Sequence, residues 1–550
     1  MSLHPSPIGQ IPVETARVAR AAFPHGTVIT RLRDEFPALY CDEDFGALYP
    51  RRGQPGLAPR RLALVTVFQF LEHLSDRQAA DAVRSRIDWK YALGLELVDR
   101  GFHFSVLTEF RGRLLAGHAE SLLLDKMLER FKTRGLIKPR GRQRTDSTHV
   151  LGAIRDLHLL ELVTETMRAT LNEVAAVAPQ WLCGIAEPVW FKRYARRAED
   201  WRLPGGSQEK REAFAQQVGA DGFALIDALE GESAPRSARE VPMLATLRQV
   251  WQTHFERVSG GPPRWRNQLP PVGERIQSPY DPQMHYSTKR GLEWSGYKVH
   301  VTETCDHNAV HVITHVETRP AMEPDMSATA MIHARLAARG MLPAEHFVDS
   351  GYVDAELLVA SQRDHGVSLQ GPVRGLSTWA SRAGHGYDLP NFSIDWERKQ
   401  VTCPQGKVSV GWTEVRDSAG HPRIHARFGR ADCGNCEARP LCTPAKEARR
   451  AVYFHPRDEY EALNAARERM HDLEWQKQYR VRAGVEGTLS QGVRAFGMRR
   501  SRYIGQAKTA LQQIFAAVSI NARRVVGWID EQPHAATRIS RFMRLAPWPS

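Results

Sequence analysis

The amino-acid sequence predicts an α/β protein in which two insertions interrupt a central sheet. Three observations indicate this fold class: β-branched alternating segments typical of strands, apolar helical periodicity between them, and two long stretches of different composition. The 550 residues are 42% hydrophobic and 25% charged, and the 41 Gly and 33 Pro are scattered rather than periodic. This composition is globular, and it excludes collagen-like and wholly disordered proteins.

The charge of the chain favours a polyanionic partner. Its 75 Lys and Arg outnumber its 62 Asp and Glu, which gives a formal net charge of +13. Residues 132–144 hold six basic residues and no acid, and residues 477–508 hold eight basic residues and one acid. Apolar stretches such as residues 61–71 are shorter than the ~18 residues of a membrane helix, and the N-terminus does not resemble a secretion signal. We therefore expect a cytoplasmic protein with no membrane partner.

Residues 1–130 are predicted to form a helical N-terminal domain for DNA binding or dimerisation. Apolar residues recur at helical spacing over 62–71, and Ser75 and Gln78 have the spacing of a capping box that begins a second helix. Two helices joined by a tight turn, with three arginines on the second, permit a helix-turn-helix that binds DNA. An ordinary helical hairpin explains the same residues.

Residues 131–373 are predicted to form the first part of a sheet-containing core, interrupted by a helical insertion at about residues 155–275. The insertion is rich in charge, repeats apolar residues at helical spacing, and ends near a Gly-Gly-Pro-Pro sequence. The elements expected around it are, in order, strands at 142–154, 297–304 and 309–317, a helix at 325–339, a strand at 346–349, a helix at 354–364 and a strand at 367–373.

Two aspartates lie on these predicted strands, and each is followed by Ser. Asp146 lies on the first strand, and Asp349 lies at the end of a later one. If the two strands are adjacent and parallel, their carboxylates come together, and such a pair is costly unless a divalent cation neutralises it. Aspartates at strand ends also commonly cap turns, so either residue alone permits a purely structural interpretation.

Glu486 is the only acid in the second basic run, within a helical segment predicted over 457–530. Tyr479, Arg482 and Glu486 fall on one face of a helix. Gly484 and Gly487 flank the glutamate, and each costs a helix about 1 kcal/mol relative to Ala, which suggests that something approaches closely. A salt-bridge hub is the alternative for the glutamate, but it leaves the glycines unexplained.

Residues 374–456 are predicted to form a cysteine-rich insertion, and residues 531–550 a loose basic tail. Four of the seven cysteines occur in the insertion, namely Cys403, Cys433, Cys436 and Cys442. Four thiolates with one Cys-x2-Cys spacing suit a tetrahedral structural Zn²⁺ site. A chance group of reduced cysteines is the alternative. The odd total of seven does not indicate a disulfide framework.

Three motifs together resemble those of bacterial insertion-sequence transposases of the DDE class, in the IS-four-like superfamily and closest to the branch numbered eleven-eighty-two. The motifs are residues 144–148 around Asp146, residues 347–352 around Asp349, and the family's Tyr-Arg-Glu signature at Tyr479, Arg482 and Glu486. The resemblance extends over nearly the whole chain. One departure occurs seven positions after the glutamate, where the signature has a basic residue and this chain has Val493, with Arg494 beside it.

The resemblance implies an RNase H-like mixed-sheet core and a zinc-ribbon-like cysteine insertion. The residues that it implies to be catalytic, and to hold two Mg²⁺ or Mn²⁺ ions, are Asp146, Asp349 and Glu486. The residues that it implies to contact DNA are Arg144, Tyr479, Arg482 and Arg494. Two metal ions activate the attacking oxygen and stabilise the leaving oxygen in phosphodiester transfer, which agrees with paired carboxylates.

The sequence therefore predicts a nucleoid-associated transposase that binds the terminal inverted repeats of an insertion sequence and acts as a metal-dependent endonuclease and strand transferase. Its expected partners are double-stranded terminal repeats, target DNA and a second copy of the chain in the DNA complex. An RNase H-like structure-selective nuclease is the alternative enzyme. A DNA-binding derivative without catalysis is the alternative from another class, and the intact set of three acids favours an enzyme.

Overall fold

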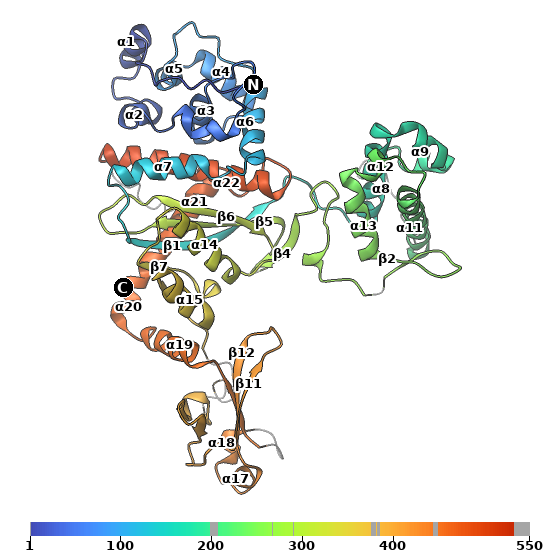
Figure 1. The fold of residues 1–550 in the computed structure, drawn as a ribbon, viewed down its shortest axis with the longest axis vertical. Helices are drawn as coiled ribbons and strands as arrows, with labels where there is room; N and C mark the ends of the chain where they lie inside the picture. The colour runs from blue at the N-terminus through green and yellow to red at the C-terminus, as the bar shows by residue number, and fades with distance from the viewer. Residues whose placement is uncertain are drawn as a thin grey trace, which may run out of the picture.

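The computed structural model describes residues 2–198, 207–266, 268–289, 291–375, 381, 385–443 and 449–532. A mixed sheet lies at the centre with helices on both faces, and two groups of elements project from it (Figure 1). Most of the predicted basic tail, from residue 533 onward, lies outside the described residues. Within the described part of the chain, every helix is too short or too polar to cross a membrane.

Seven helices precede the sheet: α1 (Val13–Ala22), α2 (Val28–Glu35), α3 (Pro59–Leu71), α4 (Asp76–Ser85), α5 (Ile87–Leu93), α6 (Ser105–Ala116) and α7 (Leu122–Thr133), with a 3-10 turn η1 (Asp42–Leu48) between α2 and α3. The predicted capping box is confirmed, since Ser75 accepts from the Gln78 backbone and Gln78 from the Ser75 backbone. Nearly every residue of α3 is buried. The helix packs on the C-terminal helix α22 (Gln506–Ile529), where the rings of Phe70 and Phe515 lie 5.3 Å apart.

The central sheet has six strands: β1 (Arg142–Leu151), β4 (His285–Lys289), β5 (Leu292–Thr304), β6 (Ile313–Pro320), β7 (Glu345–Phe347) and β8 (Ser368–Gln370). They run in the order β4-β5-β1-β7-β8, and β6 also pairs with β5. The pairs β1/β5, β4/β5 and β5/β6 are antiparallel, whereas β1/β7 and β7/β8 are parallel. This curled mixed sheet fits an RNase H-like core.

Helices cover both faces of this sheet. On one face lie α14 (Met326–Ala338) and α15 (Ala355–His365); on the other lie α7, α21 (Gly484–Ala495) and α22 (Figure 1). One continuous hydrophobic core joins the N-terminal helices, the sheet and α22. The N-terminal helices therefore fold onto the core rather than around a separate interior.

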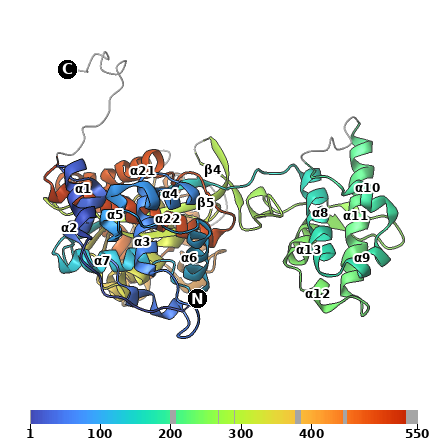
Figure 2. The same cartoon turned by 90° about the horizontal axis from the view of Figure 1, so that it is seen from above.

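The chain between β1 and β4 forms a second unit, the helical lobe (residues 157–276). Its elements are α8 (Leu159–Val177), α9 (Pro179–Ile185), α10 (Pro188–Arg193), α11 (Gln208–Glu230), α12 (Arg236–Arg239), α13 (Pro242–His254), β2 (Phe255–Glu256), β3 (Arg264–Trp265) and the 3-10 turn η2 (Val272–Glu274). The lobe has its own hydrophobic core and stands away from the sheet (Figure 2). A side chain at Gly222 on α11 would overlap the ring of Trp251 on α13, so glycine permits these helices to pack closely.

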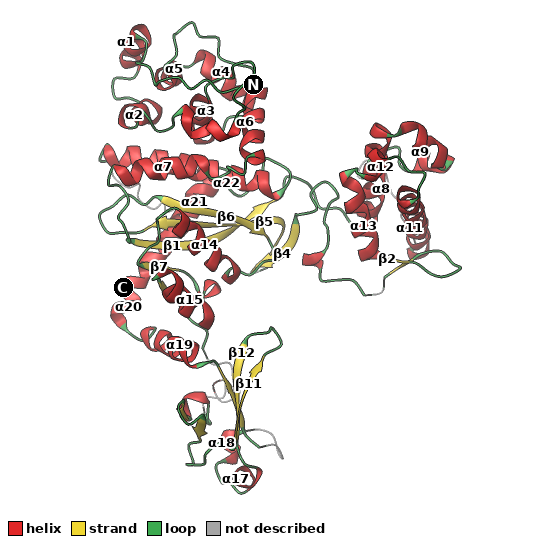
Figure 3. Ribbon diagram, in the orientation of Figure 1, coloured by secondary structure: helices red, strands yellow, loops and turns green. Residues whose placement is uncertain are grey.

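A third unit, the cysteine lobe (residues 385–454), follows β8 and consists mainly of short strands (Figure 3). Its elements are η4 (Leu389–Asn391), β9 (Ser393–Asp395), β10 (Gln400–Thr402), β11 (Gly411–Arg416), β12 (Pro422–Arg427), α17 (Arg430–Gly434), α18 (Arg439–Cys442) and β13 (Ala451–Phe454). The chain then returns to the core through α19 (Arg457–Arg469), α20 (Leu473–Tyr479), the 3-10 turn η5 (Arg480–Ala483), α21 and α22.

Most predicted elements of the core are present with shifted ends, and two differ. The predicted strand at 309–317 begins only at Ile313, because the preceding residues form a loop in which the carbonyl of Val312 accepts from Thr304. Strand β4 was not predicted. It pairs antiparallel with the first residues of β5, and its five residues are mostly polar and are partly buried or exposed.

A chain of buried polar side chains joins the strands to α14. Thr145 on β1 is hydrogen-bonded to Thr302 at 2.7 Å and to His346 on β7 at 2.6 Å. The other ring nitrogen of His346 is 2.8 Å from His333 on α14. Burial, together with the nearby His365, lowers the pKa of His333 to about 4. Both imidazoles are therefore neutral at pH 7.

Because His333 is buried and neutral, the folded protein should lose stability in mild acid. An unfolded chain binds a proton at His333 below about pH 6.5, whereas the folded chain stays neutral there until about pH 4. Stability is complete above pH 6.5 and falls as the pH drops, and between about pH 8 and about pH 5 this one group accounts for about 2 kcal/mol. Urea unfolding of wild type and His333→Gln should show a pH dependence that is smaller in the variant by this amount. Equal pH dependence in the two proteins would contradict the assignment.

Candidate active site

Strand pairing places the two predicted aspartates side by side. In the parallel pair β1/β7, Arg144 lies opposite Phe347, and each aspartate follows two residues later. Asp349 lies at the end of β7 and also caps the 3-10 turn η3 (Ser350–Tyr352), where its Oδ1 accepts from the backbone of Gly351 at 2.8 Å. Asp349 therefore caps the turn with Oδ1, which agrees with the turn-cap interpretation, while its Oδ2 lies 3.8 Å from the guanidinium of Arg482.

One guanidinium joins the three predicted acids, Asp146, Asp349 and Glu486, which we call the acid trio. Arg482 in η5 lies 2.7 Å from Oδ2 of Asp146, 3.8 Å from Oδ2 of Asp349 and 2.7 Å from Oε1 of Glu486. The side chain of Arg482 is 15% exposed and that of Glu486 is 62% exposed. The structure thus gathers residues from β1, the end of β7 and α21 at one place that opens to solvent.

The electrostatics of this place are dominated by excess negative charge. Burial raises the pKa of Asp146 to about 6, against the lowering effect of Arg482, and the neighbouring Asp349 raises it further. Burial opposes the charge of Arg482, but its carboxylate neighbours raise the pKa of the guanidinium overall. One cation faces three carboxylates, and carboxylate oxygens are the ligands that Mg²⁺ and Mn²⁺ prefer. The residue types of the acid trio are therefore those that a divalent cation prefers, although among the described residues no three such side chains are arranged to hold a metal ion.

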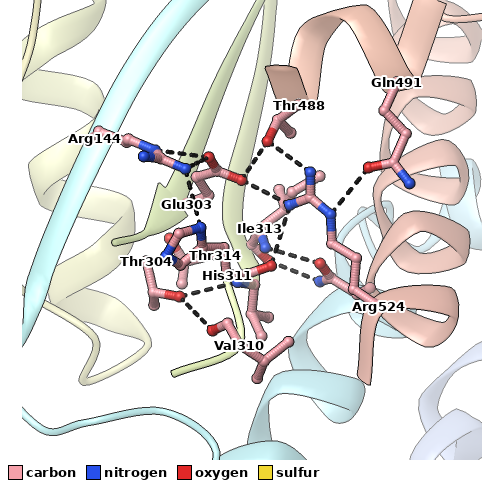
Figure 4. A network of polar contacts seen from close by, with 12 residues as sticks. Arg144, Glu303, Thr304, Val310, His311, Ile313, Thr314, Thr488, Gln491 and Arg524 are labelled. Atoms are coloured by element: carbon pink, nitrogen blue, oxygen red, sulfur yellow. Dashed lines mark hydrogen bonds and ion pairs between the residues drawn. The ribbon is translucent and has the colours of Figure 1, made fainter. Parts of the chain in front are cut away.

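A buried ion-pair network holds the segment that carries Arg482 and Glu486 (Figure 4). Glu303 on β5 has a fully buried side chain and forms ion pairs with Arg144 at 2.6 Å and with Arg524 on α22 at 2.7 Å. It also accepts a hydrogen bond from Thr488 on α21 at 2.6 Å. Arg144 in turn donates to the carbonyl of Val481 at 2.6 Å. The network therefore contacts η5 before Glu486, at Val481, and α21 after it, at Thr488.

Arg144 lies inside this network and not at the surface, although the resemblance implies a phosphate contact for it. Its side chain is buried, paired with Glu303, and hydrogen-bonded to His311 at 3.1 Å. A side chain at Gly484 would overlap its guanidinium, which explains the first of the two glycines. No atom outside the local backbone lies within 4 Å of where a side chain at Gly487 would begin, so packing does not explain the second.

The other predicted DNA contacts, Tyr479, Arg482 and Arg494, have different surroundings. Tyr479 donates to the carbonyl of Val348 at 2.9 Å and stacks on Trp475, and burial raises its pKa to about 12. It anchors the end of α20 to the residue before Asp349. Arg482 binds the acid trio. Arg494 is exposed in the last turn of α21.

Sequence reasoning missed the residues that support the acid trio, chiefly Glu303, Thr488 and Arg524. Glu303 could have been noticed as the one acid in the predicted strand at 297–304, because an acid is not expected on the inward face of a strand unless it is paired. A further missed acid is Asp325, just before α14, which lies 3.2 Å from the hydroxyl of Ser147 and 3.0 Å from the amine of Lys298.

The four predicted zinc ligands surround one small cavity in the cysteine lobe. Cys403, Cys433, Cys436 and Cys442 all line it. Over the described ranges, however, no group of three or more His, Cys, Asp or Glu side chains has an arrangement that could hold a metal ion. Burial raises the pKa of the Cys442 thiol, and the backbone of Arg450 donates to Cys433. The structure therefore does not support the predicted zinc site.

Two family models match separate parts of the chain. Residues 402–526 match a Transposase DDE domain, and residues 17–113 match a Transposase domain (DUF772). The first match includes Glu486 and the four clustered cysteines, and the second includes most of the N-terminal helices. No curated protein matches the chain. The two matches support a DDE transposase, an enzyme of DNA transposition, and leave the particular insertion-sequence branch open.

The contrast between the two glycines of α21 yields a prediction about stability. Gly484→Ala should destabilise the protein by about 1–3 kcal/mol, because the new methyl group displaces a guanidinium that Glu303, Val481 and His311 hold in place. Gly487→Ala is the matched control, and it should leave stability unchanged or raise it by up to about 1 kcal/mol, since alanine favours helix. Urea unfolding of both variants measures the difference. Equal effects of the two substitutions would show that Arg144 does not require the space at Gly484.

Proposed function

We propose that this protein is a transposase that binds the terminal inverted repeats of an insertion sequence and catalyses metal-dependent DNA cleavage and strand transfer. The observation that carries the proposal is the meeting of Asp146, Asp349 and Glu486 around Arg482, beside the adjacent inner strands β1 and β7 of a mixed sheet. The two transposase domain matches support it independently.

In this proposal the acid trio holds Mg²⁺ or Mn²⁺. When bound, two such ions would activate the attacking oxygen and stabilise the leaving oxygen of the phosphodiester. Carboxylates are the residue type that these ions prefer, and Asp146 and Asp349 each have one oxygen engaged by a backbone amide and the second directed toward Arg482. The backbone amides fix the orientation of both carboxylates.

The residues of the chain orient the DNA and neutralise charge. Arg482 is proposed to have a second role beside its carboxylates, since a guanidinium carries five N–H donors and can also donate to a nonbridging phosphate oxygen. Water attacks first and breaks the bond to the 3′ oxygen at the element end, which leaves as a hydroxyl. That hydroxyl then attacks a target phosphodiester, so the number of phosphodiester bonds is conserved in the second step.

The N-terminal helices are proposed to recognise the terminal repeats, with a second copy of the chain in the DNA complex. On α4 the side chain of Arg84 is 57% exposed. Arg86, by contrast, is paired with Glu72 and Asp88, and Arg77 lies over the ring of Phe104. Arg84 pairs with Asp81 at 3.4 Å on an exposed surface and donates to the carbonyl of Arg100, weak contacts that a phosphate could replace, so Arg84 is the arginine of this helix proposed to contact DNA.

Removal of single carboxylates tests the mechanism. Asp146→Asn, Asp349→Asn and Glu486→Gln should each abolish end cleavage and strand transfer, because metal coordination and charge neutralisation fail together. Each variant should still bind terminal-repeat DNA. The substrates are labelled duplexes that carry the inverted repeats found by sequencing the DNA on either side of the gene, with Mg²⁺ or Mn²⁺ and without ATP.

Glu474→Gln is the matched control, because this glutamate on α20 is 71% exposed and pairs only with a lysine one turn away. It should cleave and join normally. Normal cleavage by Glu486→Gln would mean that the third ligand is misassigned; Glu474→Gln would then cease to be a control and would be compared with Glu468→Gln as a test of the next two candidates. Cleavage without joining by the wild type would favour the structure-selective nuclease, and binding alone would favour a DNA-binding derivative.

A further inference from the structure

The segment between α21 and α22 returns to the strand that carries Asp146. The backbone of Leu151, at the end of β1, donates to the carbonyl of Arg499 at 2.8 Å, and its own carbonyl accepts from Ser501 at 2.9 Å. These two hydrogen bonds extend the edge of the sheet by a short parallel bridge between Leu151 and Arg500. The position of Arg499 is therefore set by the backbone and does not depend on its side chain.

The side chain of Arg499 lies on the same side of β1 as Asp146. It donates to the hydroxyl of Thr148 at 3.1 Å. Thr148 is two residues after Asp146, so both side chains leave the same face of the strand about 7 Å apart. Arg499 is exposed, and no carboxylate among the residues that the structure describes forms an ion pair with it.

A second cation lies nearby, at the tip of the β4/β5 hairpin. The side chain of Lys289 is 49% exposed and is 3.8 Å from Asp325, a long and weak ion pair. Burial lowers the pKa of His149, the residue after Thr148, and both Arg499 and Lys289 lower it further. The two cations thus act on the same few residues at the end of β1.

Cations beside the acid trio would add phosphate contacts to those of the site itself. Arg482 is shared among three carboxylates, so only part of its donor capacity is left for a phosphate. The buried cations Arg144 and Arg524 are not available to bind phosphate, because both form ion pairs with Glu303. Exposed cations without strong protein partners, close to the carboxylates, are free to bind phosphate.

We infer that Arg499 and Lys289 bind the phosphodiester backbone of the DNA strand that enters the acid trio, one or two nucleotides from the bond to be cleaved. This inference rests on the proposed function and adds two DNA-binding residues to it. The contact is to phosphate, so it gives position and affinity and does not read base sequence.

Salt dependence of DNA binding tests the inference without requiring catalysis. Each phosphate contact contributes about 0.9 to the slope of log affinity against log salt, so Arg499→Gln and Lys289→Gln should each reduce the slope by about one for a labelled random-sequence duplex. Arg499→Lys keeps the charge and should restore the slope. Arg236→Gln is the control for net charge, since Arg236 is 90% exposed in the helical lobe, and it should leave the slope unchanged.

A second experiment locates the contact. Neutral methylphosphonates replace single phosphates along a terminal-repeat duplex, and each is tested with wild type and Arg499→Gln. One position, within two nucleotides of the cleaved bond, should weaken wild-type binding and have no further effect on the variant.

Unchanged slopes in Arg499→Gln and Lys289→Gln, an equal loss of slope in Arg236→Gln, or additive effects at every methylphosphonate would each overturn the inference. Failure of the proposed function gives a different result. In that case the Asp146→Asn protein and the wild type would process the terminal repeats alike, whatever the slopes are.

Discussion

The rest of the site depends on the ion pairs that the buried carboxylate of Glu303 forms. Its side chain is 0% exposed, and it is paired with Arg144 from β1 and Arg524 from α22. Burial alone would raise its pKa, but the two guanidinium groups hold the pKa of Glu303 below its usual value. A buried charge that loses its partner typically costs 3–5 kcal/mol, so each arginine is required wherever Glu303 is present. The triad therefore fixes the sheet and the C-terminal helices relative to one another.

Arg144 and Arg482 have different roles in this arrangement. Arg144 and Arg482 come from segments that touch, since the first donates to the carbonyl of Val481 and the second follows directly in the chain. Arg144 is satisfied by Glu303 and faces the interior, whereas Arg482 faces the acid trio and solvent. Because Arg144 fixes the backbone beside Arg482, the outward guanidinium can bind carboxylates or phosphate without losing its position.

Local patterns in the sequence predicted the strands, the helices around them and the capping box at Ser75, because these depend on neighbouring residues. The sequence offered the parallel pairing of β1 with β7 only as a condition under which the two aspartates would meet, and the structure fulfils that condition. The interior position of Arg144 could not be predicted, because its counter-charge lies 159 residues away and only the fold brings it near. The continuous core of the N-terminal helices and the sheet was missed for the same reason, as was β4, whose polar residues carry no strand signal.

The three acids of the acid trio lie far apart in the sequence, and a physical reason explains why long insertions between them do not disturb their arrangement. The helical lobe lies between the first two acids, and the cysteine lobe lies between the second and the third. Each lobe buries its own hydrophobic cluster, so it contributes its own stability and needs little from the sheet. The entropy of closing a loop grows only with the logarithm of its length, so a long lobe costs little more than a short connection. The site requires the chain to return to the sheet at fixed positions after each lobe. The β1/β7 register and the ion pairs of Glu303 provide those positions.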